Sequence, residues 1–221
     1  MKPFAPGLPT VGALLLALGG PPLLAMVGRR VLGDSTSVPR MLPFDLVLWV
    51  ILAVVLVVVV RVEKQPLGSI GLHRPRWSTL GWALVLLVGI SFVVVPAAMG
   101  LAHAAGLPGY ERGLARLMRL PAWYRLFLAV SAGVVEEVLY RGYAVERLAA
   151  LTGSHWHGGA IAVIVFTAAH LPVWGVGPLP AFFAASAVAT AFYVWKRDLG
   201  ALMIAHALGD GIGLVFLPPV S

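Results

Sequence analysis

Long apolar runs constrain this chain more than any other feature. A helix that crosses a bilayer needs about 20 predominantly apolar residues. Runs of about this kind cover 8–27, 44–60, 77–102, 121–151, 158–171, 179–195 and 201–217. Their length favours helix over strand, although many of their residues are β-branched. We therefore predict an all-α fold: a polytopic transmembrane helical bundle of about seven spans.

The composition agrees with a membrane protein. Hydrophobic residues make up 60% of the 221 positions and charged residues only 11%, against about 25% charged in an ordinary soluble domain. The bilayer must therefore solvate much of the apolar surface. A net charge of +7 would suggest nucleic acid in a soluble protein. Here the basic residues lie mostly between apolar runs, so we predict the lipid bilayer as partner and no nucleic acid.

The chain shows neither an internal repeat nor a linker. We expect a single integral membrane domain over 1–221, with a motif-bearing catalytic half at about 121–217. Met1-Lys2-Pro3 opens onto an apolar stretch that resembles a signal but lacks a clear cleavage site, which favours a retained helix. In 106–119, three arginines at helical spacing predict a short amphipathic helix on the membrane surface.

Glycine and proline predict where the helices bend or end, and basic residues predict which side of the membrane the helix ends occupy. Gly19-Gly20-Pro21-Pro22 predicts a kink or break in the first run, and Pro172 is expected to end the fifth. Alternating spans place Arg147 and Lys196 on one side, which the positive-inside rule makes cytoplasmic. We expect a multi-pass protein of a prokaryotic plasma membrane.

Several ionisable residues lie inside the apolar runs, where such a residue is by default a functional hypothesis. Glu137 and Arg141 are four residues apart, so they can pair along one helix face and support the structure. Glu136 points about 100° away around the same helix and finds no partner there. It therefore becomes the first candidate for a functional role.

Two histidines occupy later runs. His170 ends Phe166-Thr167-Ala168-Ala169-His170, and His206 lies four residues before Asp210, on the same helix face. A single intramembrane histidine more often serves helix packing than catalysis, but three polar helices in one short chain favour a site. At 1.5 Å per residue, all these groups lie roughly 10–20 Å deep and could converge in one layer.

Three ordered motifs carry a resemblance. They are Glu-Glu-x-x-x-Arg at 136–141, Phe-x-x-x-His at 166–170 and His-x-x-x-Asp at 206–210. This set resembles the CPBP family of CAAX proteases and bacteriocin-processing enzymes, also called the Abi or Rce1-like family. The resemblance implies a glutamate-dependent, metal-independent intramembrane endopeptidase acting on a membrane-associated peptide or protein.

The resemblance also implies roles for particular residues. Glu136 and His170 would activate the attacking water, and His206 would donate to the oxyanion. The residue that matches Asp210 is often Asn in the family. Because an ionised Asp cannot donate, we expect Asp210 either to be protonated or, preferably, to orient His206 as an acceptor. Phe166 would support the site, as Glu137 and Arg141 do.

The residues themselves are compatible with this chemistry. The chain has no Cys, and we discount Ser131 as a nucleophile, so water is expected to attack. A carboxylate in an apolar pocket becomes a stronger base for that water. No cofactor is then needed. The alternative is a divalent metal such as zinc held by the histidines and glutamates, although no His-Glu-x-x-His spacing occurs.

Two other function classes remain open. Intramembrane Glu, His and Asp also serve as proton relays, as in a proton-coupled membrane transporter. Inverted repeats would favour transport, and none is evident. A non-catalytic membrane scaffold or immunity protein could keep the same fold. Cleavage of a membrane peptide separates the protease from both.

Overall fold

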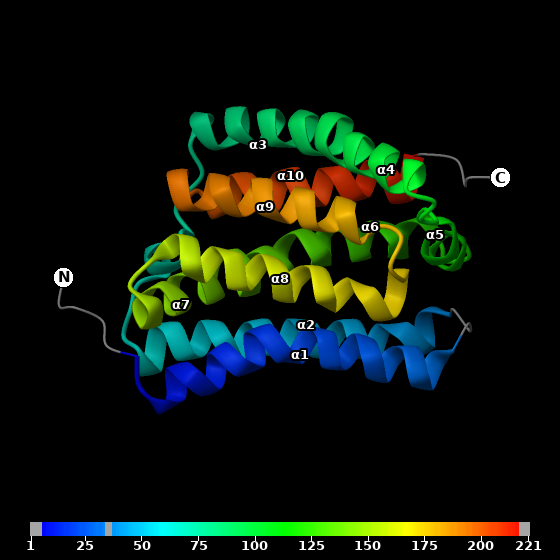
Figure 1. Cartoon of the computed structure of the whole chain (residues 1–221). Helices are drawn as coiled ribbons and strands as arrows, with labels where there is room; N and C mark the ends of the chain where they lie inside the picture. Colours follow the sequence, from blue (N-terminus) through cyan, green and yellow to red (C-terminus); the bar gives the residue numbers. More distant parts are fainter. Residues whose placement is uncertain (1–5, 34–36, 217–221) are drawn as a thin grey trace.

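The computed structural model describes residues 6–33 and 37–216, and every regular element within them is a helix (Figure 1). Met1-Lys2-Pro3 and the predicted last residue of the final span, Leu217, lie outside the described residues. The helices run side by side in stacked layers, with α1 and α2 at one face and α3 at the opposite one.

The elements follow one another with short connections. They are α1 (Leu8–Leu32), α2 (Val38–Val57), η1 (Val58–Val62), η2 (Leu67–Ile70), α3 (Trp77–Gly89), η3 (Ile90–Val94), α4 (Val95–Ala104), α5 (Glu111–Leu117), α6 (Ala122–Ser131), η4 (Ala132–Ala144), α7 (Val145–Thr152), α8 (His155–Trp174), α9 (Leu179–Lys196), α10 (Leu199–Gly211) and η5 (Ile212–Phe216). Except for the 3₁₀ turn η2, the η segments are π-helical and continue the α-helices beside them.

Among the described residues, six helices are long and apolar enough to cross a membrane. They are Leu8–Leu32, Val38–Val62, Trp77–Ala104, His155–Trp174, Leu179–Lys196 and Leu199–Phe216. The predicted polytopic bundle is thus confirmed. The remaining predicted run forms one continuous helix, 122–152, from α6, η4 and α7. Its second half is almost entirely buried, so the protein and not the lipid solvates its charges.

Helices do not end at the prolines where breaks were predicted. Pro21 and Pro22 lie inside α1, which continues unbroken to Leu32. Pro172 lies inside α8, which ends only at Trp174, before Gly175 at φ 77°. Membrane helices tolerate proline because neighbouring helices, side chains and local π adjustments compensate for the lost backbone hydrogen bond. The range 106–119 contains a short helix as predicted, α5, but it covers only Glu111–Leu117.

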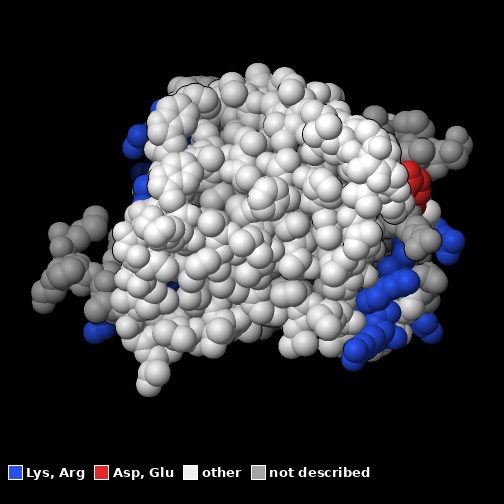
Figure 2. Space-filling model, viewed as in Figure 1, with Lys and Arg blue, Asp and Glu red and all other residues white. Residues whose placement is uncertain are grey.

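The outer surface matches the hydrocarbon of a bilayer. Only 22–33% of the residues in the apolar windows are buried inside the protein, so most of their side chains point outward. Figure 2 shows Lys and Arg gathered towards the two ends of the helices, with a broad uncharged surface between them. This arrangement is that of an integral membrane protein.

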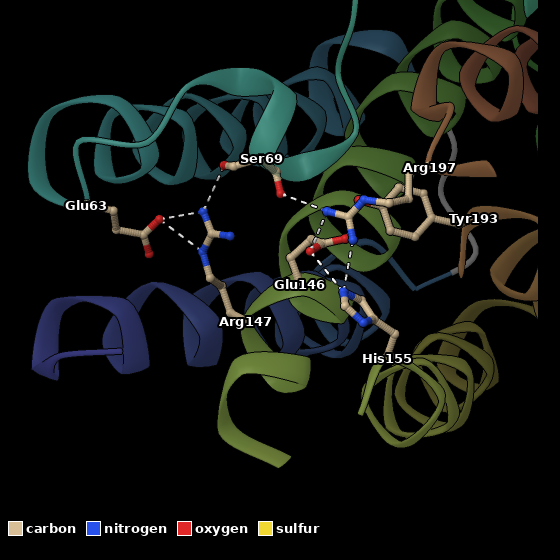
Figure 3. A network of polar contacts seen from close by, with 7 residues as sticks. All are labelled: Glu63, Ser69, Glu146, Arg147, His155, Tyr193 and Arg197. Atoms are coloured by element: carbon tan, nitrogen blue, oxygen red, sulfur yellow. Dashed lines mark hydrogen bonds and ion pairs between the residues drawn. The ribbon is translucent and has the colours of Figure 1, made fainter. Parts of the chain in front are cut away.

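At one end of the bundle, a network of polar contacts joins segments that are far apart in the sequence (Figure 3). Arg147 of α7 donates to Glu63 from Nε at 3.0 Å and from Nη2 at 2.6 Å. The Tyr143 hydroxyl donates to the other oxygen of Glu63 at 2.9 Å. The connection after η1 is thereby fastened to the central helix 122–152.

A second part of this network ties α7 to the end of α9. Glu146 forms an ion pair with Arg197 at 2.7 Å and accepts a hydrogen bond from Tyr193 at 3.0 Å. His155 lies 3.3 Å from the same carboxylate. Arg147 and the end of α9 therefore lie at the same end of the bundle, as the alternation of spans predicts.

We expect Glu63→Gln to destabilise the protein by about 1–3 kcal/mol, because Arg147 loses a charged partner but keeps an amide oxygen that can accept. The measurement is reversible unfolding in mixed micelles. Unchanged stability would mean that this contact contributes little to the fold.

One glycine permits a close helix contact that positions the polar residues. A Cβ built on Gly133 of η4 would lie 2.7 Å from both the backbone nitrogen and the Cβ of Ala207 in α10. Small residues at such crossings let two helix backbones approach closely. Gly133 therefore sets the distance between η4 and α10, the helix that carries His206.

We expect Gly133→Ala to cost about 1–3 kcal/mol of stability, because the added methyl group overpacks the η4–α10 contact. Gly89→Ala is the matched control, since a Cβ at Gly89 meets nothing within 4 Å. Thermal unfolding of both variants in detergent measures the difference. Equal effects would show that the crossing at Gly133 tolerates a side chain.

Candidate active site

The first motif lies on a π-helical segment. η4 spans Ala132–Ala144 within the continuous helix and carries Glu136, Glu137 and Arg141. π-helical turns occur frequently at functional sites. They hold more residues per turn than an α-helix, so neighbouring side chains diverge by less than the 100° expected from the sequence. Glu136 and Glu137 nevertheless reach different surroundings.

A cavity of about 240 Å³ opens beside this segment. Glu136 and Tyr140 of η4 line it together with His170 of α8. Helices α1, α2 and α5 and further residues of α8 contribute the rest of the wall. This cavity can hold several water molecules. It brings together two of the four predicted catalytic residues, Glu136 and His170.

Glu136 is the carboxylate without a local partner, as expected from its helix position. Its Oε2 is buried and has no hydrogen-bond partner among the described residues. Buried polar atoms of this kind are rare in native proteins and point to strain, a bound water or ion, or a catalytic role. The unpaired oxygen belongs to a side chain that lines the cavity.

The ring of His170 is held by its own helix. Nδ1 lies 2.8 Å from the carbonyl oxygen of Phe166, which can only accept, so Nδ1 carries the proton. In the neutral ring, Nε2 is then left as the acceptor. The rings of Phe166 and Phe182 pack against the imidazole at 4.6 and 4.2 Å. His170 is therefore fixed in position and tautomer.

The expected Glu137–Arg141 pair forms deep inside the bundle. Nη1 of Arg141 lies 3.1 Å from Oε1 of Glu137, and both side chains are almost fully buried. Nη2 donates to the Ser186 hydroxyl at 2.9 Å, and the guanidinium lies over the Phe166 ring at 4.1 Å. Ser186 was not predicted, because a serine in an apolar run gives no sequence signal.

Glu137 has a second partner that the sequence did not predict. The same Oε1 accepts from Nδ1 of His206 at 2.8 Å. Nε2 of His206 faces Oδ2 of Asp210 at 3.5 Å. The expected alignment of His206 and Asp210 is thus present, but neither residue lines the cavity that holds Glu136. Glu137 joins α10 to η4 as well as balancing Arg141.

Two further polar side chains have partners that the sequence did not indicate. Asp45 of α2 lines the cavity and accepts a hydrogen bond from the Tyr124 hydroxyl. Its position near the start of an apolar run suggested only the end of a span. Ser131, discounted as a nucleophile, accepts from the Trp49 indole at 3.0 Å.

Tyr110 lies outside the membrane-spanning helices, directly before α5. Its ring packs edge-on against Trp174 and Phe182, each at 5.7 Å. Burial raises the pKa of Tyr110 to about 12, and the nearby charge of Asp210 adds to the effect. The phenol therefore stays neutral and can donate at physiological pH.

Within 6–33 and 37–216, no group of three or more His, Cys, Asp or Glu side chains is placed to hold a metal ion. The zinc alternative therefore gains no ligand set from these residues.

An intramembrane polar site enclosed by apolar helices defines the class: an integral membrane protein with ionisable groups in its interior. Residues 118–212 match the family described as type II CAAX prenyl endopeptidase Rce1-like. The matched range contains the three motifs, so the match confirms the resemblance drawn from them. No curated protein and no solved structure matches the chain.

The family supports a general functional statement. An Rce1-like domain implies a CAAX-type protease that works within the membrane on a membrane-associated substrate. The match contains all three motifs and ends within η5. It does not include α1 and α2, although both line the cavity.

Proposed function

We propose that this protein is an intramembrane endopeptidase that hydrolyses a peptide bond of a membrane-associated, CAAX-type substrate without a cofactor. One observation carries the proposal. A single cavity is lined by Glu136, which has an unpartnered buried oxygen, and by His170, whose Nδ1 contact leaves Nε2 as an acceptor. Two basic groups beside one space can activate a water molecule.

In the proposed reaction, Glu136 accepts a proton from water while Nε2 of His170 orients that water. The hydroxide adds to the carbonyl carbon of the substrate, and the carbonyl oxygen becomes an oxyanion. The carbon–nitrogen bond then breaks, and the proton held by Glu136 passes to the leaving amine. The products are a new carboxyl terminus and a new amino terminus.

We propose that His206, which contacts Glu137 and Asp210, donates a hydrogen bond to the oxyanion. Because Glu137 faces Nδ1, His206 can donate from Nε2 only in its doubly protonated form. The contact with Asp210 at 3.5 Å favours that form and orients the ring. An oxyanion would have to share Nε2–H with Asp210.

We also propose that the chain acts as one membrane domain whose catalytic half covers about 121–217. The contribution of α1 and α2 to the cavity wall supports a single domain. The shared position of Arg147 and the end of α9 supports placing that end in the cytoplasm of a prokaryotic cell.

Cleavage of defined probes tests the proposed function. The purified full chain in nanodiscs is mixed with peptides that end in Cys-a-a-X, in farnesylated and unmodified forms. Mass spectrometry identifies the products. We expect the protein to cleave at least one probe in the presence of a chelator, and we expect Glu136→Gln and His170→Ala each to lower the cleavage rate by orders of magnitude.

The same preparation separates the protease from a transporter. Proteoliposomes with a trapped pH dye report proton flux under an imposed gradient. Flux that Glu136→Gln abolishes, with no cleavage of any probe, would replace the proposal by proton-coupled transport. If the protein shows no proton flux and cleaves no probe, the result would favour the non-catalytic scaffold.

A further inference from the structure

Tyr140 is a buried group that the proposed reaction has not yet used. It lies on η4, four residues after Glu136, and lines the same cavity. The residue is 1% exposed. Its hydroxyl is buried and has no hydrogen-bond partner within the described part of the chain. Buried hydroxyls usually form a hydrogen bond, so the absence of one at Tyr140 among the described residues requires a physical explanation.

The other tyrosine hydroxyls buried along this helix have partners. Tyr143, three residues later, donates to Glu63 and lies 3.3 Å from the carbonyl of Thr10. Tyr124 donates to Asp45. An unpaired Tyr140 is therefore a local exception and not a general property of the bundle.

The Tyr140 ring cannot easily turn to find another partner. It meets the Phe166 ring edge to face at 5.1 Å and 88°. Phe166 is itself held between this ring, the His170 imidazole at 4.6 Å and the Arg141 guanidinium at 4.1 Å. A hydroxyl that is held in place on a side chain lining the cavity is a preorganised donor, the kind that stabilises developing negative charge.

The reaction needs such a donor. A tetrahedral oxyanion requires donors near its oxygen, and both ring nitrogens of His206 already face carboxylates. His206 and Asp210 also lie outside the cavity lining, whereas Tyr140 shares that lining with Glu136 and His170.

We propose that the Tyr140 hydroxyl is an oxyanion donor of this protease, an inference that rests on the proposed function. It donates a hydrogen bond to the carbonyl oxygen as water adds and keeps its own proton throughout. The proton lost by water goes to Glu136 and then to the leaving amine, so the balance of the reaction is unchanged.

Tyr140→Phe tests this role, because it removes only the hydroxyl and leaves the ring packing. We expect kcat to fall about 100-fold and KM to stay within about twofold, as for the loss of one oxyanion donor. The pH dependence of kcat should keep its shape. Tyr143→Phe is the matched control: it removes a buried hydroxyl from the same helix outside the cavity, and folded protein should keep its kcat.

Binding provides a readout that does not require turnover. A probe peptide with a phosphonamidate in place of the scissile amide mimics the charged tetrahedral state. We expect Tyr140→Phe to weaken its binding about 100-fold and to leave binding of the parent peptide unchanged.

Unchanged kcat in Tyr140→Phe, while Glu136→Gln is inactive, would overturn the role of Tyr140 and leave the proposed protease intact. Equal binding of the phosphonamidate to both proteins would overturn it too. A loss of kcat explained entirely by a shifted pH profile would show that Tyr140 acts on Glu136 and not on the oxyanion.

Discussion

Glu136→Gln is expected to lower kcat by about a thousandfold, within the range attributed to a general base. Glutamine has nearly the same shape but cannot accept the proton of the attacking water. Because Oε2 of Glu136 is buried and unpaired, removing the charge should leave thermal stability unchanged or raise it. Single-turnover cleavage and thermal unfolding in the same detergent measure the two effects.

A second buried carboxylate serves as control. Glu63→Gln changes the same chemical group at the network of Figure 3, outside the cavity, and the folded protein should keep its kcat. Wild-type activity in Glu136→Gln would show that another residue activates the water. A large loss of stability in that variant would show that Glu136 holds the fold together.

Glu137→Leu is expected to destabilise the protein by about 3–5 kcal/mol, the cost of leaving a buried charge without its partner. Arg141 would keep only Ser186 and the Phe166 ring, and His206 would lose its contact at Nδ1. Reversible unfolding in mixed micelles gives the free energy.

The double variant Glu137→Leu/Arg141→Met separates pairing from packing. Replacing both charges by apolar groups of similar size should recover most of the lost stability. It should not recover activity, because His206 still lacks its acceptor. If the double variant is as unstable as the sum of both single variants, the pair is not the source of the effect.

The length of the apolar runs was enough to predict the bundle, because backbone groups in hydrocarbon must be satisfied within a helix. The ends of the individual helices were harder to predict. Pro21, Pro22 and Pro172 were expected to interrupt helices, but tertiary neighbours allow α1 and α8 to continue. The central helix 122–152 was predicted from its hydropathy, while its burial depends on which helices surround it.

The features of the candidate site that depend on residues close in sequence were predictable. The separation of Glu136 from the Glu137–Arg141 pair follows from helix geometry alone. The Glu137–His206 contact joins residues 69 positions apart and depends on the close approach at Gly133. Tyr140 gave no signal, because an aromatic residue in an apolar run resembles ordinary packing.

The central claim is that Glu136 and His170 act on one water molecule in one cavity. A double-mutant cycle on kcat/KM with Glu136→Gln, His170→Ala and the double variant tests it most directly. Because both residues serve a single step, we predict that the double variant loses no more than about tenfold beyond the worse single variant. Losses that multiply would mean two independent roles, and full activity in either single variant would contradict the shared site.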